Sequence, residues 1–139
     1  MKKFRKAITW MLPAIAVVML AGLILSRVIS PSSGLRDPEV RITPYEADIY
    51  DGRYVEVCGV VESADFVPQI GGEPTFLNMG GVYPNQVFTV IIWGEYRDQW
   101  SLPPDERYLS RDICVVGTVY MHRGIPQIRV TRPEQIRAR

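Results

Sequence analysis

Hydrophobic and polar positions follow three patterns along the chain. Residues 7–26 are a run of twenty positions without a charged side chain, residues 30–42 are rich in Ser, Pro and Gly, and from residue 54 hydrophobic residues alternate with polar ones. A helix of twenty residues rises by about 30 Å, which matches the hydrocarbon core of a bilayer. The patterns therefore predict a basic start and transmembrane anchor at 1–29, a linker at 30–42 and a folded domain at 43–139.

Two observations bear on the fate and orientation of the predicted membrane helix. A cleavable signal peptide has an apolar stretch of about 7 to 15 residues and a small-x-small cleavage site, whereas this run is longer and ends at Ser26 and Arg27. We expect a retained signal-anchor, with a cleaved signal peptide as the alternative. Four basic residues lie within 2–6, but only Arg27 follows the run closely. By the positive-inside tendency, the N-terminus is cytoplasmic and the domain is extracytoplasmic at the cell membrane.

The alternating part of the chain contains five short segments that favour β-strands. Along 54–61 and 113–119 every second residue is Val, Ile or Gly, as in a strand with one buried face. The runs 75–79, 87–93 and 126–130 are shorter but also favour strands, and turn residues separate them.

Signals for helices are few. Thr43, Pro44 and Glu46 combine a capping hydroxyl, a proline at the first helical position and a carboxylate three residues after the cap. We therefore expect a short helix that ends near Tyr50. Residues 95–100 form the only helix that we expect between the strands, because the two prolines that follow stop a helix.

The order of three strands, a short helical connection and two more strands matches the OB-fold, a five-stranded Greek-key barrel. Gly59 and Gly117 fit this fold, because strongly bent barrel strands need a position without a side chain. The predicted fold class is all-β: a five-stranded OB-fold Greek-key barrel with short helices, preceded by one N-terminal transmembrane helix. Another small β-barrel or open sheet, such as an SH3-like one, is the alternative.

Several segments of the domain together resemble a known family. They include Thr75-Phe76-Leu77-Asn78 and Tyr83-Pro84-Asn85-Gln86, with 54–61, 87–93 and 124–128 around them. In this order they look like the OB-fold modules that occur alone or beside nuclease domains in bacterial secreted and surface proteins. The resemblance implies an OB-fold of the broad nucleic-acid-binding class, similar in style to anticodon-binding barrels, and it implies no catalytic residue.

Charge differs between the two parts of the chain. Every lysine lies at or before Lys6, and residues 30–139 carry 11 Arg against 15 Asp and Glu, a net charge of −4. Affinity for a polyphosphate backbone needs a basic face. The acidic balance thus weighs against non-specific nucleic-acid binding, although a local arginine patch is compatible with it.

Cys58 and Cys114 are the two cysteines of the chain. Their spacing fits neither a zinc ribbon nor a thioredoxin-type redox motif. Strand phase places both on the outer faces of 54–61 and 113–119, which are antiparallel neighbours in an OB-fold. A disulfide can persist outside the cytoplasm. The pair is therefore either one disulfide or two buried thiols, and the strand register decides between them.

Aromatic and arginine side chains are the candidates for ligand contact. An OB-fold binds single strands on the face of its second and third strands, with aromatic side chains and a basic groove. Most of the nine aromatic residues between Phe66 and Tyr120 are nevertheless expected in the core. For the arginines, ion pairs with surface carboxylates are the alternative. The predicted ligand-binding residues are Tyr83, Asn85, Arg97, Tyr120, Arg123, Arg129 and Arg132.

The sequence shows no recognisable catalytic or metal-binding pattern. His122 is the single histidine, so a multi-histidine metal site cannot form and a familiar histidine-dependent triad has no other candidate. No phosphate-binding loop or nucleophile motif is present. We expect a protein that is not an enzyme and uses no metal or cofactor.

Two functions remain. The first is a membrane-tethered OB-fold module that binds single-stranded DNA or RNA outside the cytoplasm. The alternative is a protein-interaction or structural module of the cell envelope, with an envelope protein as its partner and no nucleic-acid ligand. Fold analogy favours the first, and the acidic charge of the domain favours the second.

Overall fold

The computed structural model describes residues 34–139, so the predicted anchor and the start of the linker lie outside the described residues. No helix within 34–139 is long and apolar enough to cross a membrane. The elements, with η for 3₁₀ helices, are β1 (Arg41–Ile42), η1 (Pro44–Tyr50), β2 (Tyr54–Phe66), β3 (Thr75–Met79), β4 (Phe88–Ile92), α2 (Gly94–Arg97), α3 (Pro104–Tyr108), β5 (Asp112–His122), β6 (Ile125–Arg129), η2 (Pro133–Gln135) and β7 (Ile136–Ala138).

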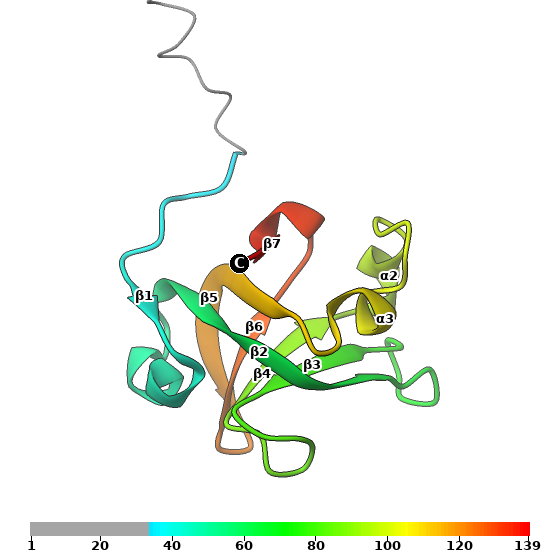
Figure 1. The fold of residues 1–139 in the computed structure, drawn as a ribbon, viewed down its shortest axis with the longest axis horizontal. Helices are drawn as coiled ribbons and strands as arrows, with labels where there is room; N and C mark the ends of the chain where they lie inside the picture. Colours follow the sequence, from blue (N-terminus) through cyan, green and yellow to red (C-terminus); the bar gives the residue numbers. More distant parts are fainter. Residues whose placement is uncertain (1–33) are drawn as a thin grey trace, which may run out of the picture. The chain divides into compact units, whose positions relative to one another are not determined.

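Five of the strands close into a barrel (Figure 1). β2, β3 and β4 form an antiparallel meander, and β5 returns to pair with the first half of β2, which is the Greek-key order. β6 then lies between β5 and β4 and runs parallel to β4. The ring is thus β2-β3-β4-β6-β5 and back to β2. This confirms the prediction of an all-β, five-stranded barrel with short helices.

Hydrophobic side chains on the inner faces of the strands fill the barrel, as the alternating pattern predicted. Val57 and Val115 face each other across the β2–β5 seam, and Val90 and Ile128 do so between β4 and β6, all fully buried. The hydrophobic core formed by the described residues lies within 42–136. Residues 35–139 form one compact unit around this core, so we expect them to fold as a domain.

Gly59 and Gly117 lie where the barrel wall approaches its neighbours closely. A Cβ on Gly59 would lie 2.7 Å from Pro44 Cγ, and a Cβ on Gly117 would lie 2.5 Å from Ile128 Cγ2. Both distances are far inside van der Waals contact. Pro44 and Ile128 can therefore approach β2 and β5 this closely because these two positions carry no side chain.

The helix predicted after Thr43 is present as the 3₁₀ helix η1. The backbone N–H and the hydroxyl of Thr43 each donate to Glu46 Oε2 at 2.7 Å. These two hydrogen bonds hold the pKa of Glu46 below its ordinary value. Pro44 and Ala47 form the buried side of the helix. The chain then enters β2 through Gly52, whose φ of 79° is in the left-handed region that favours glycine.

Among the described residues, the structure contains two helices that the sequence pattern does not predict, α3 and the 3₁₀ helix η2, and the predicted helix at 95–100 is shorter than expected. We expected a helix at 95–100 and none after it, whereas α2 ends at Arg97 and α3 begins at Pro104. Proline is favoured at the first position of a helix, where no N–H is needed, so Pro104 starts a helix instead of only ending one. Trp100 Nε1 donates to the Tyr108 hydroxyl at 2.9 Å, which fastens α3 to the core.

Two short strands widen the β2–β5 seam into a four-stranded face. β1 pairs parallel with β2, with Arg41 opposite Glu56, and β7 pairs antiparallel with β5, with Arg137 opposite Cys114. β1 occupies the last two residues of the predicted linker, so strand pairing begins earlier than the sequence indicated. Strands of two or three residues show no measurable alternation, which is why the pattern did not predict them.

Candidate nucleic-acid interface

One row of side chains crosses the outer surface of the barrel over five strands. Leu77, Val90 and Ile128 pair across β3, β4 and β6 and point into the core. The side chains of the adjacent residues Asn78, Thr89 and Gln127 point to the opposite face. We call the outward residues at this level the polar row, which consists of Ser63 on β2, Asn78 on β3, Thr89 on β4, Gln127 on β6 and Tyr120 on β5.

Hydrogen bonds fix the polar row from both ends. Asn78 Nδ2 donates to Ser63 Oγ at 3.1 Å, and Thr89 Oγ1 donates to Asn78 Oδ1 at 2.9 Å. At the other end, the Tyr120 hydroxyl donates to Gln127 Oε1 at 2.9 Å. Asn78 and Thr89 are each only 1% exposed. The side chains of the polar row are therefore fixed in position, and most of their hydrogen-bonding groups bond to one another.

Arg129 covers the ring of Tyr120 at one end of the polar row. The guanidinium carbon lies 4.4 Å from the ring centroid, which is a cation–π contact. Arg129 is exposed and forms no ion pair with any residue in the described part of the chain. The pair presents a guanidinium plane to solvent, and such a plane can bind a phosphate or stack on a base.

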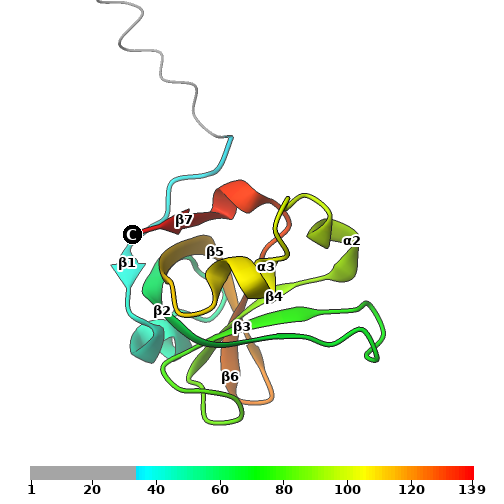
Figure 2. The same cartoon turned by 45° about the vertical axis from the view of Figure 1, so that its right-hand side comes forward.

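Two loops lie side by side at one end of the barrel, at the bottom of both Figure 1 and Figure 2. The β3–β4 loop carries Tyr83 and Asn85, which are exposed, and the β5–β6 turn carries Arg123, which is also exposed. The Tyr83 backbone N–H donates to Ser63 Oγ at 3.1 Å, so this loop is tied to the β2 end of the polar row. The Tyr83 side chain is left 68% exposed. An aromatic ring and a guanidinium are thus available on adjacent loops.

Two of the predicted ligand residues lie elsewhere. Arg97 Nη2 is 2.8 Å from Asp105 Oδ1, and Arg97 Nη1 donates to Thr75 Oγ1 at 2.6 Å. The guanidinium also lies 3.8 Å from the centroid of the Phe66 ring. Arg97 is therefore a largely buried arginine that pairs a carboxylate, which was the alternative for these residues. Arg132 is exposed beyond the end of β6 that is opposite the β5–β6 turn.

Sequence reasoning did not single out the buried members of the polar row. Asn78 stands between Leu77 and Met79, which are both fully buried in the core. A polar residue between two core residues of a strand lies on the outward face, so the signal was present in the alternation. Thr89 and Gln127 have the same position in their strands. Of the nine aromatic residues, Phe88, Trp100 and Tyr108 are buried and Tyr96 packs against the core, so fewer of them lie in the core than the sequence led us to expect.

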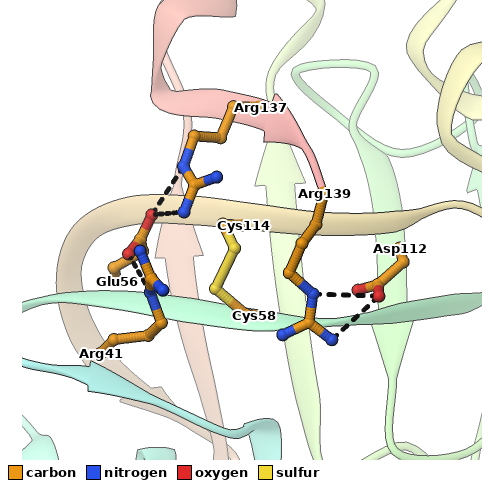
Figure 3. Close-up of polar contacts among 7 residues, drawn as sticks. All are labelled: Arg41, Glu56, Cys58, Asp112, Cys114, Arg137 and Arg139. Atoms are coloured by element: carbon orange, nitrogen blue, oxygen red, sulfur yellow. Dashed lines mark hydrogen bonds and ion pairs between the residues drawn. A yellow bond between two sulfur atoms is a disulfide. The ribbon is translucent and has the colours of Figure 1, made fainter.

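A second polar cluster lies on the outer face of β1, β2, β5 and β7 (Figure 3). Glu56 accepts hydrogen bonds from Arg41 Nε at 2.6 Å and from Arg137 Nε at 2.9 Å. Burial alone would raise the pKa of Glu56, but the hydrogen bonds and charges of the two arginines outweigh it and hold the pKa below its ordinary value. Beside Glu56, Cys58 and Cys114 are directly opposed in the strand register and are joined in a disulfide.

Three residues around the disulfide lie close enough together to be considered as metal ligands. The sulfur atoms of Cys58 and Cys114 and a carboxylate oxygen of Glu56 lie within 4.8 Å of one another. Cysteine binds metals as the thiolate. In the disulfide form neither cysteine offers a thiolate, and both carboxylate oxygens of Glu56 face arginine.

Comparisons with known proteins leave the family open. No family model matches the sequence, and no curated protein matches it. Among the solved structures that match is a protein from Leishmania major Friedlin, provisionally described as an aspartyl-tRNA synthetase, with 13% identity and a TM-score of 0.45. The match covers 78% of this chain and 22% of that one. Function must therefore be inferred from the barrel and its outer face.

Proposed function

We propose that the described barrel is an OB-fold module that binds single-stranded nucleic acid through the exposed side chains that border the buried polar row, Arg129, Arg123 and Tyr83. The Arg129–Tyr120 pair is the observation that carries this proposal. It exposes a guanidinium without a carboxylate partner among the described residues. The outer face of β3 and β4, the second and third strands of the ring, corresponds to the face on which OB-folds bind single strands.

The mode of binding follows from the chemistry of each group. Arg123 and Arg129 would pair with backbone phosphates, and Tyr83 would stack on a base. The polar row uses its hydrogen-bonding groups internally, so it offers little readout of base edges and we expect little sequence preference. The net charge of −4 on residues 30–139 opposes long-range attraction to phosphate, so we expect modest affinity.

A titration of residues 35–139 with fluorescent oligothymidine and oligouridine tests this proposal. Fluorescence anisotropy at about 50 mM salt, where phosphate contacts are strongest, should show saturable binding that weakens at about 200 mM. The absence of binding at the lower salt concentration would contradict the proposal. It would then favour an envelope protein as the partner, as expected for a protein-interaction or structural module.

We further propose that the uncharged run at 7–26 anchors the protein in the cell membrane, with the barrel outside the cytoplasm. The length of the run and the basic residues before it support this location. Membrane fractionation and N-terminal sequencing of the mature protein test it. A mature protein that begins near Ser30 would show that the segment is a cleaved signal peptide. The proposed role is binding without catalysis, metal or cofactor.

A further inference from the structure

Three arginines gather on the wall of the barrel formed by the β2–β5 seam (Figure 3). Arg41 on β1 and Arg137 on β7 both bind the carboxylate of Glu56, with Arg137 Nη2 also 2.8 Å from Glu56 Oε1. Just beyond β7, Arg139 Nη2 lies 2.9 Å from Asp112 Oδ2. β1 and β7, which lie on either side of the β2–β5 pair, thus bring arginine side chains to one surface.

A fourth arginine extends this surface towards the linker. The Arg36 guanidinium lies 4.4 Å from the centroid of the Tyr54 ring. Tyr54 is two residues before Glu56 in β2, so both side chains point outward from the same strand. We define the arginine face as Arg36, Arg41, Arg137 and Arg139.

Charge on this surface is layered. The side chains of Arg41, Arg137 and Arg139 are 60%, 49% and 51% exposed, whereas the side chain of Glu56 is 8% exposed. Around Glu56, solvent therefore meets the guanidinium groups of Arg41 and Arg137 with the carboxylate buried beneath them, whereas Asp112, the partner of Arg139, has a side chain that is itself 37% exposed. Arg41 uses only its Nε in hydrogen bonds with the described residues. Its terminal nitrogens can donate to an external anion without releasing Glu56.

We propose that the arginine face binds the anionic headgroups of a lipid bilayer, so that the barrel lies on the membrane with this wall down. The proposal rests on the membrane location proposed above. Charge complementarity supports it, because four arginines share one surface of a domain whose overall charge is −4. The orientation places the cationic wall against an anionic surface and leaves the acidic remainder directed away from it.

Chain length and topology favour a lipid surface over another anionic partner. The stretch 27–34 between the predicted anchor and the described unit can span at most about 30 Å, which keeps the barrel near the bilayer. Arg36 lies two residues after this stretch, and β1 begins at Arg41. In the ring of five strands, β4 lies across from the β2–β5 seam. A barrel that rests on the arginine face would therefore direct the outer face of β4 away from the bilayer.

Vesicle binding by residues 35–139 tests the proposal without depending on the anchor. Large vesicles of phosphatidylcholine with about 30% phosphatidylglycerol should bind the domain more tightly than vesicles of phosphatidylcholine alone, in a salt-sensitive manner. Arg139→Gln should weaken binding to the anionic vesicles about fivefold, the effect of one basic residue near the surface. Adding Arg41→Gln should weaken it about fivefold again, while Arg137 still pairs Glu56. Arg107→Gln on α3 is the charge-matched control and should not weaken binding.

The experiments distinguish failure of the lipid-binding proposal from failure of the nucleic-acid-binding proposal. Equal binding to both kinds of vesicle, or unchanged binding by the double variant, would overturn the lipid assignment. If the double variant instead loses oligothymidine binding and wild-type vesicle binding is absent, the arginine face is a nucleic-acid surface and the proposal is wrong. Thermal unfolding of each variant shows that the barrel is intact. Loss of oligothymidine binding by Arg123→Ala, Arg129→Ala or Tyr83→Ala concerns only the nucleic-acid proposal.

Discussion

The Arg129 guanidinium lies 4.4 Å from the centroid of the Tyr120 ring, and the hydroxyl of the same tyrosine donates to Gln127. The ring is thus held at its edge by a hydrogen bond and covered on one face by a cation. A side chain whose position is already fixed loses less conformational entropy when it binds a ligand. Arg129 is therefore the position where substitution should affect nucleic-acid binding most directly.

The first prediction concerns the two arginines assigned to phosphate contact. Arg129→Ala and Arg123→Ala should each weaken binding of single-stranded DNA and reduce the salt slope by at most about one, because each removes one phosphate contact. Anisotropy titrations between about 50 and 200 mM salt measure both quantities. Arg107→Ala is the matched control, since Arg107 is exposed on α3 and forms no ion pair with the described residues. An equal loss in the control would indicate a general charge effect.

The second prediction separates base stacking from fold stability. Tyr83 is 68% exposed, so Tyr83→Ala should leave the unfolding temperature unchanged but cost about 1–3 kcal/mol of binding free energy if its ring stacks on a base. Tyr45 on η1 is 70% exposed and provides the comparison. Tyr45→Ala should bind oligothymidine as the wild type does. Wild-type affinity in the Tyr83 variant would remove the β3–β4 loop from the site.

Much of the barrel could be predicted because the information is local. Alternation along 54–61 and 113–119 identified the inner faces of β2 and β5, and the register then placed Cys58 opposite Cys114. β1, β7 and α3 could not be found in this way. The two short strands exist through pairing with distant segments, and α3 depends on the bond between Trp100 and Tyr108.

The candidate site shows the same division between local and long-range information. Tyr83 and Arg123 were identified from loop signals, and the structure leaves them exposed. Arg97 looked equally suitable in sequence, but its environment is set by Asp105 and by Phe66 from β2. The sequence pattern alone cannot distinguish an arginine that forms an ion pair with a carboxylate from one that is free to bind a phosphate.

The third prediction is a dependence of stability on pH through Glu56. Its pKa in the folded protein lies below the ordinary value of 4.5, so the unfolded chain binds the proton more readily than the folded one. The stability that Glu56 contributes is therefore complete above about pH 4.5 and is lost as the pH falls through the folded-state pKa. Denaturant unfolding of the wild type and of Glu56→Gln between pH 7 and pH 3 measures this.

Glu56→Gln should lower the unfolding free energy by about 1–3 kcal/mol at pH 7, because charged hydrogen bonds to Arg41 and Arg137 are lost. Its stability should depend less on pH below 4.5 than that of the wild type. Glu106→Gln is the control, since Glu106 is exposed on α3 and pairs with no arginine among the described residues. Parallel acid profiles for the wild type and Glu56→Gln would refute the linkage.

The fourth prediction concerns the glycines at the bends. Gly59→Ala and Gly117→Ala should each destabilise the barrel by about 1–3 kcal/mol, because the added methyl group meets Pro44 or Ile128 well inside van der Waals contact. A Cβ on Gly71 meets nothing within 4 Å, and its backbone lies outside the left-handed region. Gly71→Ala should therefore be neutral or slightly stabilising. Urea unfolding compares the three variants, and equal stability of all three would exclude a packing role for the glycines.

The last prediction concerns the disulfide on the outer face of β2 and β5. Cys58 and Cys114 are buried and directly opposed, and they are separated by 56 residues in sequence. A cross-link that closes a loop of this length restricts the unfolded chain and should contribute about 2–4 kcal/mol. The double variant Cys58→Ala/Cys114→Ala should lose this amount, and reductant should lower the unfolding temperature of the wild type but not of the variant.

Protein taken from its native compartment should resist alkylation until it is denatured and reduced. Two alkylated cysteines after denaturation without reductant would contradict the bridge. They would also weaken the extracytoplasmic location, because a compartment that favours disulfides would be expected to close a pair so placed.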